Sequence, residues 1–483
     1  MSMPEPSSAA AQGVTQPRLS AGRGHTAAVP IGQRWGEYLY FTSIVLAVVP
    51  FGAVHAIPLG LSAVVTCLVL VLSLGRAVTN PAIGRLIVQA AGVAALLTGW
   101  LLVQSLSAPD ILPSHPAWRS VERDFGAIEP SISINPNATA WSLIDLATPF
   151  LSFVSALILF GNDTAAARLW RFLRLFGLGV TIFGLAQFLI LPNTILFYEK
   201  WAYHGSLTAT FVNRNSAATF LGLVALLWFG EFLGNMRRLA WRDLADRLSS
   251  FRWGGGDDLS HVLRAALATF LCLGALFLST SRGGLIATTL GFSVVFVAMD
   301  GGAAAARPGA LWRLLAGLGL LLMVFVLFGG LALQRLRVQG ADEDRLCTYL
   351  STVEAIRDNW LFGTGFGTFA NIFPLYRDPS CAGIEGVWDR VHNSYLEAIL
   401  GLGLIFAAPL IYCASRLVST FRVGIATRRR QRHFAAVGLG VLALVASHAL
   451  VDFSIQIHGV AMYWVAILAA TAAIALGRSG RVM

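Results

Sequence analysis

Residues 86–106 read LIVQAAGVAALLTGWLLVQSL and contain no charged side chain. A bilayer core is crossed by about 20 apolar residues in a helix, so this stretch is long enough to span it. Similar apolar blocks recur along the chain, for example at Tyr38–His55 and Leu311–Leu333. Of the 483 residues, 56% are hydrophobic and only 12% are charged. A soluble domain carries about twice that charged fraction. The sequence therefore predicts an all-α polytopic membrane protein.

Hydropathy predicts about twelve transmembrane helices. We expect nine of them within residues 36–333 and the last three within residues 392–476. Residues 334–391 form the largest hydrophilic segment, and we predict a loop domain with helical stretches there. The first 35 residues have no apolar core, which argues against a cleavable signal peptide and for a disordered tail. Residues 477–483 form a second short tail. The spans are expected at 38–55, 57–75, 86–107, 141–160, 172–192, 214–235, 262–280, 284–300, 311–333, 392–414, 434–453 and 459–476.

Basic residues divide unevenly between the two sides of these spans. Of the 35 Lys and Arg residues, all but Lys200 are Arg, and 24 fall in the tails and one alternating set of loops. The positive-inside rule makes that set cytoplasmic, together with both termini. Segments 108–140, 193–213, 281–283 and 334–391 then lie on the outer, non-cytoplasmic face of the membrane. The formal charge of +10 lacks the interleaved aromatic and basic residues of a nucleic-acid-binding domain, so no nucleic-acid partner is expected.

The five cysteines fall into two groups, one in apolar blocks and one in the large hydrophilic loop. Cys67, Cys272 and Cys413 lie in apolar blocks and are interpreted as packing residues. Cys347 and Cys381 share the large hydrophilic loop. A disulfide between them is a hypothesis that depends on the loop facing an oxidising compartment.

Two arginines lie at predicted outer ends of spans. Arg214 follows Asn213 at the start of one span, and Arg282 lies in a short Ser-Arg-Gly-Gly turn between two others. Backbone N–H groups at a helix N-terminus favour anions, and a guanidinium adds two-pronged recognition of phosphate oxygens. The alternative is an interfacial arginine that extends toward lipid headgroups. Two such arginines at one face would suit a pyrophosphate.

A histidine opens the segment where the large loop re-enters the membrane. His392 begins the run His-Asn-Ser-Tyr-Leu-Glu, which ends at Glu397. The positive end of a helix dipole favours the neutral imidazole, which can accept a proton from a hydroxyl. A structural, hydrogen-bonded histidine is the alternative interpretation.

His448 and Asp452 are four residues apart, so we expect them on one face of the eleventh span. Ionisable groups inside a span are functional candidates, although an interhelical hydrogen bond would also explain them. Two further motifs are weak. The glycines of Gly363–Gly367 follow no strand, which disfavours a nucleotide site. The acidic run Asp342–Asp344 is interpreted as a solvated charge run rather than a metal site.

Together, these motifs resemble the O-antigen ligase and O-antigen polymerase superfamily of bacterial membrane glycosyltransferases. The resemblance covers roughly residues 100–476. It rests on Asn213-Arg214-Asn215, on Ser281-Arg282-Gly283, on the long loop that ends at His392–Glu397, and on His448–Phe453.

This resemblance implies a GT-C-like fold and an inverting, metal-independent glycosyl transfer without a cofactor. The donor would be a glycan carried on undecaprenyl pyrophosphate, held by Arg214 and Arg282. His392 would be the general base for the acceptor hydroxyl. Asp452, His448, Glu397 and Tyr395 would support the site.

The resemblance allows two acceptors for the transferred glycan, a growing chain or a core lipid. A polymerase for an exopolysaccharide or O-antigen is favoured, because nothing in the sequence specifically indicates a core-lipid acceptor. A ligase that transfers the polymer to lipid A–core is the alternative, and a chain-length regulator is a further candidate partner. A transporter or flippase of lipid-linked sugars is the hypothesis from another class. It predicts cationic residues deep within the spans, whereas the arginines cluster at their ends.

Overall fold

The computed structural model describes residues 31–108, 110–126, 128–237, 257–300, 343–378 and 388–477. These residues are mostly helical, and the single sheet among them is a hairpin of β1 (Thr194–Ile195) and β2 (Tyr198–Glu199). The long helices are α1 (Ile31–Val48), α2 (Ala56–Ser73), α3 (Pro81–Ser105), α5 (Pro136–Leu159), α6 (Asp163–Ile190), α7 (Arg214–Met236), α9 (Asp257–Leu278), α10 (Arg282–Asp300), α16 (Ala407–Thr427), α17 (Arg432–His448) and α18 (His458–Leu476). Four shorter helices are α4 (Trp118–Phe125), α13 (Glu343–Asp358), α14 (Phe369–Tyr376) and α15 (Ser394–Leu402).

Nine helices within the described residues are long and apolar enough to cross a membrane. This confirms an all-α membrane protein, while the count of twelve stays a prediction. Helices α1 and α17 correspond to two further predicted spans and pack in the same bundle, with α17 only 17 residues long. The span predicted at 311–333 lies outside the described residues.

The centre of the bundle is formed by α7 and α18. Both are buried along most of their length, whereas α2 and α3 expose large apolar side chains such as Val64 and Val88. Helix α18 is rich in alanine and apolar on all sides, as expected for a helix surrounded by other helices. Tyr463 lies in its second turn and donates a hydrogen bond of 2.7 Å to the carbonyl of Leu173 in α6. The surrounding helices therefore carry the lipid-facing surface.

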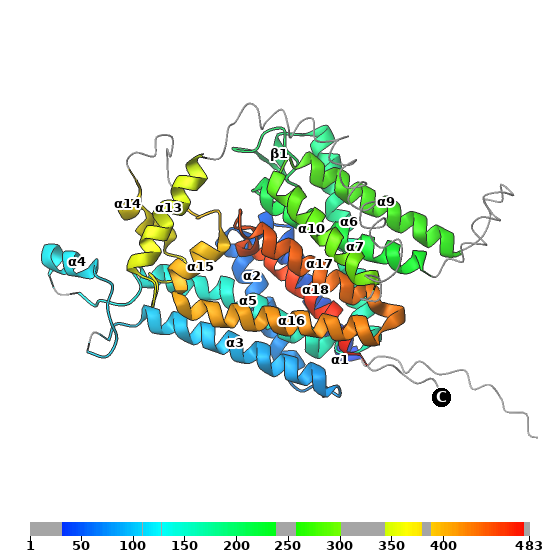
Figure 1. The fold of residues 1–483 in the computed structure, drawn as a ribbon, viewed down its shortest axis with the longest axis horizontal. Coiled ribbons are helices and arrows are strands. Elements are labelled where there is room, and N and C mark those ends of the chain that lie inside the picture. Colours follow the sequence, from blue (N-terminus) through cyan, green and yellow to red (C-terminus); the bar gives the residue numbers. More distant parts are fainter. Residues whose placement is uncertain are drawn as a thin grey trace, which may run out of the picture.

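One end of the bundle is covered by α13, α14 and α15, and α4 lies further out at the same end (Figure 1). We call this the cap end, and the opposite end, where α7 and α10 finish and α17 begins, the tail end. A small apolar core of its own holds α13, α14 and α15 together, with Phe369, Ile372 and Leu400 buried in it. Helices α7, α10 and α17 pack side by side and run between the two ends.

The helix predicted over 392–414 is interrupted, and that prediction is wrong. The structure has α15, a break at Gly403, and then a separate α16 that continues to Thr427. Gly403 has a φ of 73°, and a side chain there would collide with the carbonyl of Leu361. Gln104 at the end of α3 fixes the break by donating to the carbonyls of Phe362 and Gly401, each at 2.8 Å. Helix α15 consequently belongs to the cap rather than to a membrane span.

The glycine run between α13 and α14 has a packing role. Gly363, Gly365 and Gly367 all have positive φ, a conformation that glycine adopts without strain. A side chain at Gly365 would collide with Ser133, and one at Gly367 with Ser142. The glycines thus let the cap approach the start of α5, which explains them without a nucleotide.

Candidate functional site

Four segments that are far apart in the sequence meet at the cap end. They are the start of α7, the turn between α9 and α10, the start of α15, and the residues after α17. Together they bring His392, Asp452, His448 and Arg214 into one polar cluster. The same four segments supplied the motifs found in the sequence.

Asp452 is the centre of this cluster. Its side chain is only 1% exposed, and one carboxylate oxygen accepts a hydrogen bond of 2.8 Å from the amide of Asn215. Ser454 donates to the other oxygen. Burial alone would raise the pKa of Asp452, but His392 and the other neighbours bring it below its ordinary value. The carboxylate is therefore held ionised beside an imidazole.

Contacts of both its backbone and its ring hold His392 in position. Its φ of 61° lies in the left-handed region, and the hydroxyl of Tyr349 in α13 donates 2.8 Å to its carbonyl. The ring lies between Trp388 and Phe453, with centroid distances of 5.7 and 4.8 Å. Its Nδ1 lies 3.6 Å from the carboxylate of Asp452. Because Nδ1 faces the carboxylate, Nε2 is the nitrogen available to a substrate.

The residues directly after His392 begin helix α15. Asn393 is the N-cap of α15, and its side chain accepts hydrogen bonds from the backbone N–H groups of Tyr395 and Leu396. Ser394 ties this turn to the residues after α17, because its hydroxyl donates to the carbonyl of Asp452 at 2.9 Å. The local sequence thus fixes the position of the imidazole relative to Asp452.

His448 is buried in the same cluster, but it does not share a helix face with Asp452. Helix α17 ends at His448, and Asp452 lies in the turn that follows, so the predicted arrangement is wrong. The carbonyl of Ala449 accepts a hydrogen bond of 2.8 Å from Ser394, which binds the end of α17 to the start of α15. Nδ1 of His448 instead lies 2.6 Å from the hydroxyl of Thr219 in α7.

The two arginines are the first residues of neighbouring helices. Arg214 begins α7, donates to the hydroxyl of Thr280 at 3.4 Å, and lies over the ring of Tyr203 at 5.3 Å. Arg282 begins α10, directly after Ser281. Ser281 joins the two helix starts by donating to the side chain of Asn215 at 2.8 Å. Two helix N-termini, each with an arginine as its first residue, therefore lie at one edge of the cluster, which suits a diphosphate.

Three residues of this site were missed in the sequence. Arg345 of α13 donates to the carbonyl of Val451 at 3.2 Å and adds a third cation beside the cluster. Tyr349 supports the His392 carbonyl, and Asn215 links Asp452 to Ser281. The only sequence signal for Asn215 was its place in the Asn-Arg-Asn motif. No pattern in the sequence indicated that α13, which carries Arg345 and Tyr349, lies beside this cluster.

Glu397 and Tyr395, two of the predicted supporting residues, act on the cluster from a distance. Glu397 is buried, pairs with Arg390 at 3.0 Å and accepts a hydrogen bond from the backbone N–H of Val391. Tyr395 donates to the carbonyl of Ala446 in α17 at 2.9 Å. Both hold the backbone on either side of His392.

A second polar group lies next to Arg390. Asp145 of α5 is 3.9 Å from His458 at the start of α18, and His458 in turn lies 3.1 Å from the hydroxyl of Ser62. Arg390 also donates to Gln456 at 3.0 Å. These contacts connect α2, α5 and α18 to Arg390 and to the turn between α17 and α18 that contains Asp452.

The cysteines and the acidic run complete the predicted features. Cys347 is disulfide-bonded, but Cys381 lies outside the described residues, so their pairing stays a prediction. Cys67, Cys272 and Cys413 are free. In the part of the chain that the structure describes, no three His, Cys, Asp or Glu residues are grouped as metal ligands. Asp342 lies outside that part.

A comparison with protein families bears on the resemblance. The model of a family described as O-Antigen ligase matches residues 267–411. This match confirms the resemblance to the O-antigen ligase and polymerase superfamily of membrane glycosyltransferases. A comparison with curated proteins found no significant match. The matched residues include Arg282 and His392, whereas Arg214 and Asp452 lie outside them and join the cluster through the fold.

Proposed function

We propose that the cluster at the cap end transfers a glycan from undecaprenyl pyrophosphate to a sugar hydroxyl, with inversion and without a metal ion. The observation that carries the proposal is the pairing of His392 with the buried Asp452 beside two arginines that begin helices. The match to the O-Antigen ligase family supports glycosyl transfer of this general type.

The arginines act on the donor. Arg214 and Arg282 hold the pyrophosphate, whose negative charge grows as the bond between the anomeric carbon and the phosphate oxygen breaks. Cations fixed in advance around a leaving anion stabilise the transition state by several kcal/mol. The positive ends of the α7 and α10 helix dipoles favour the same anion.

The histidine acts on the acceptor. Nε2 of His392 takes the proton of the acceptor hydroxyl while its oxygen attacks the anomeric carbon from the face opposite the pyrophosphate. Asp452 fixes the ring through Nδ1 and stabilises the imidazolium that forms. A positioned base of this kind contributes about 10²–10⁴-fold to the rate. A single displacement inverts the anomeric configuration.

The proposal places the cap end in the periplasm and both termini in the cytoplasm of a bacterial inner membrane. The arginine-rich loops of the predicted cytoplasmic set support this orientation. A lipid-linked donor suits it as well, because the pyrophosphate would lie at the membrane surface beside Arg214 and Arg282. The transferred bond supplies the energy, so the reaction needs no nucleotide at that face.

Within this function, we favour a polymerase that extends an exopolysaccharide or O-antigen, with a chain-length regulator as a candidate partner. A ligase to lipid A–core uses the same donor chemistry and is the alternative. Deleting the gene and analysing the glycans separates them. Loss of all long polymer indicates a polymerase, whereas accumulation of polymer on its lipid carrier indicates a ligase.

A transporter of lipid-linked sugars is the alternative from another class. Purified protein in vesicles distinguishes it, since a transferase releases undecaprenyl pyrophosphate as it joins glycans, and a flippase moves the intact donor. Release of the carrier that depends on His392 supports the transferase. Movement of intact donor without release would overturn it.

A further inference from the structure

We propose that Asp145 of α5 and His458 of α18 form a subsite that binds two neighbouring hydroxyl groups of the acceptor sugar. This inference rests on the proposed glycosyl transfer and adds a pair of residues that selects its acceptor. The carboxylate of Asp145 lies 3.9 Å from Nδ1 of His458, which is too far for a direct hydrogen bond. The hydroxyl groups would bind between these two atoms.

His458 is buried and leaves one ring nitrogen unsatisfied. Its side chain is 1% exposed, and Nδ1 has no hydrogen-bond partner among the described residues. The other nitrogen, Nε2, lies 3.1 Å from the hydroxyl of Ser62 in α2. That hydroxyl donates its own proton to the carbonyl of Ser43 at 3.1 Å, so Nε2 must donate to Ser62. In the neutral ring, Nδ1 is therefore an acceptor that faces a second acceptor, the carboxylate of Asp145.

These two facing acceptors lack a hydrogen-bond donor. A buried polar atom without a partner destabilises a fold, and such atoms are rare in native proteins. Two adjacent hydroxyl groups of a sugar supply the missing donors, one for the carboxylate and one for Nδ1. If the ring carries a second proton, a hydroxyl oxygen accepts it instead. A sugar therefore suits the gap in either protonation state of the imidazole.

Asp145 is accessible near the cap end of the bundle. Its side chain is 38% exposed, whereas that of His458 is closed to solvent. His458 is the first residue of α18, so the pair lies near the cap end and not midway along the bundle. Ionisable residues of membrane helices face the protein interior or a water-filled recess, because exposure to lipid is costly. The exposed part of Asp145 therefore indicates a hydrophilic opening.

Arg390 connects this pair to the proposed base. It precedes His392 by two residues, donates to Gln456 at 3.0 Å and pairs with Glu397. Burial alone would lower the pKa of Arg390, but the carboxylates of Glu397 and Asp145 raise it above its ordinary value. Asp145 thus lies close to the segment that carries the imidazole.

The donor arginines reach the cluster through other contacts. From the start of α10, hydrogen bonds lead through Ser281 and Asn215 to Asp452. The contacts of Arg390 lead instead from the His392 segment toward α5 and α18. An acceptor held by the subsite and a donor held by the arginines would therefore approach the imidazole from different helices. This arrangement suits a displacement in which the two sugars lie on opposite faces of the reacting carbon.

The test measures the binding of glycan fragments and does not depend on transfer. Oligosaccharide fragments, released by mild acid from the long polysaccharide of the host cell, are titrated into the purified full-length protein. The same fragments after O-methylation are the second probe, because they lack hydroxyl donors.

Two variants each remove one partner of the subsite. Asp145→Asn removes the carboxylate, and His458→Gln keeps a polar group near Nε2 but has none at Nδ1. Asp358→Asn is the matched control, because this exposed carboxylate of α13 accepts a hydrogen bond from Tyr376 outside the subsite.

We expect saturable binding of the native fragments, about tenfold weaker in both subsite variants and unchanged in the control. O-methylated fragments should bind the wild type as weakly as native fragments bind the variants. In transfer assays, the variants should raise the KM for the acceptor and leave the KM for the lipid-linked donor unchanged. Equal affinity of wild type and variants, or no saturable binding by the wild type, would overturn the proposal.

Failure of this inference can be told apart from failure of the proposed transfer. Fragment binding that depends on Asp145 in a protein without transferase activity would support the subsite and reject the transfer. Transfer with an unchanged acceptor KM in a stable Asp145→Asn protein would support the transfer and reject the subsite. The comparison of native and O-methylated fragments uses the wild type alone, so equal binding of the two probes rejects the subsite even where a variant does not fold.

Discussion

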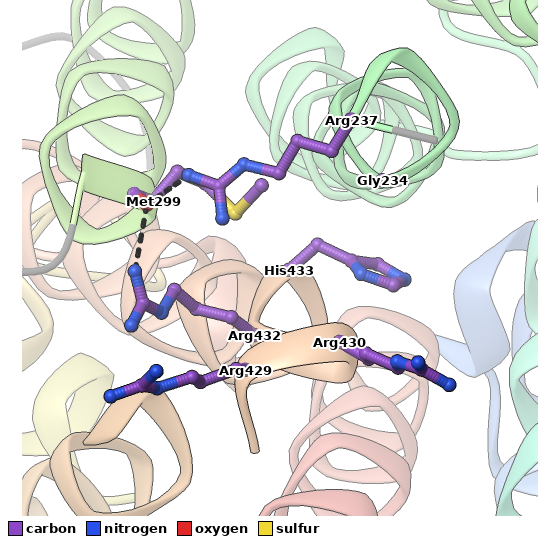
Figure 2. A pocket seen from close by; sticks show the side chains of 7 residues that line it. All are labelled: Gly234, Arg237, Met299, Arg429, Arg430, Arg432 and His433. Carbon is purple, nitrogen blue, oxygen red and sulfur yellow. Dashed lines mark hydrogen bonds between the residues drawn. The ribbon is translucent and has the colours of Figure 1, made fainter. Parts of the chain in front are cut away.

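The two ends of α7, α10 and α17 use arginine in different surroundings. At the cap end, Arg214 and Arg282 begin helices next to a buried carboxylate and an imidazole. At the tail end, Arg237 and Arg432 instead donate to the same backbone carbonyl, that of Met299 (Figure 2). Only the cap end places a group that can move a proton beside its arginines, so the proposed chemistry belongs to the cap end.

Removing the proposed base should have the largest effect. His392→Ala leaves the arginines in place but removes the proton acceptor, and we expect transfer to fall by about 10²–10⁴-fold. The measurement is polymer formation in membranes, normalised to the amount of protein that remains in them. His261→Ala is the control, since this exposed histidine of α9 lies outside the cluster. Normal polymer formation by a stable His392→Ala protein would remove the distinction between the two ends.

Replacing arginine by lysine should have the next largest effect. Arg282→Lys and Arg214→Lys keep the charge but lose the flat fork that holds two phosphate oxygens, so we expect turnover to fall roughly tenfold. Initial rates at saturating donor report this loss. The same change at Arg171 and Arg422, exposed on the other side of the membrane, should leave the rate unchanged. If lysine at the cap end is equally harmless, these arginines only contact lipid headgroups.

The positions of most helices could be predicted because apolar length is a local signal. Short motifs are local as well, and they picked out Arg214, Arg282, His392 and Asp452, whose segments the structure brings together at the cap end. The roles of these residues belong to the proposal. The break at Gly403 could not be predicted, because 392–414 is apolar on both sides of it and the break depends on contacts with Leu361 and Gln104. Hydropathy measures length and polarity, not such contacts.

The contacts that support the site could not be predicted from the sequence either. Tyr349 lies 43 residues from His392 along the chain, and the hydroxyl-to-carbonyl bond between them leaves no periodic pattern. Likewise, His448 and Asp452 suggested one helix face by their spacing, but the end of α17 separates them. Spacing predicts neighbours only where a helix continues.

The hydroxyl of Tyr349 offers a smaller test of the same comparison. Tyr349→Phe removes one hydrogen bond to the carbonyl of His392, worth about 1 kcal/mol, and should lower the rate about fivefold. The loss should appear in kcat rather than in the KM for the donor, because the arginines are untouched. Tyr376→Phe is the matched control, since its hydroxyl donates to Asp358 elsewhere in the cap. A change in donor KM alone would place Tyr349 with the arginines.

Chelation should have the smallest effect. Arg214, Arg282 and Arg345 already supply positive charge where a pyrophosphate would leave, which is the task a divalent ion performs in many other transferases. The oxygens of Asp452 are engaged by Asn215 and Ser454. We therefore expect the transfer rate in purified protein to be unchanged by EDTA. Loss of activity that returns with Mg²⁺ or Mn²⁺ would instead give the acidic run Asp342–Asp344 a catalytic role and make the arginines secondary, since a metal would then neutralise the leaving group.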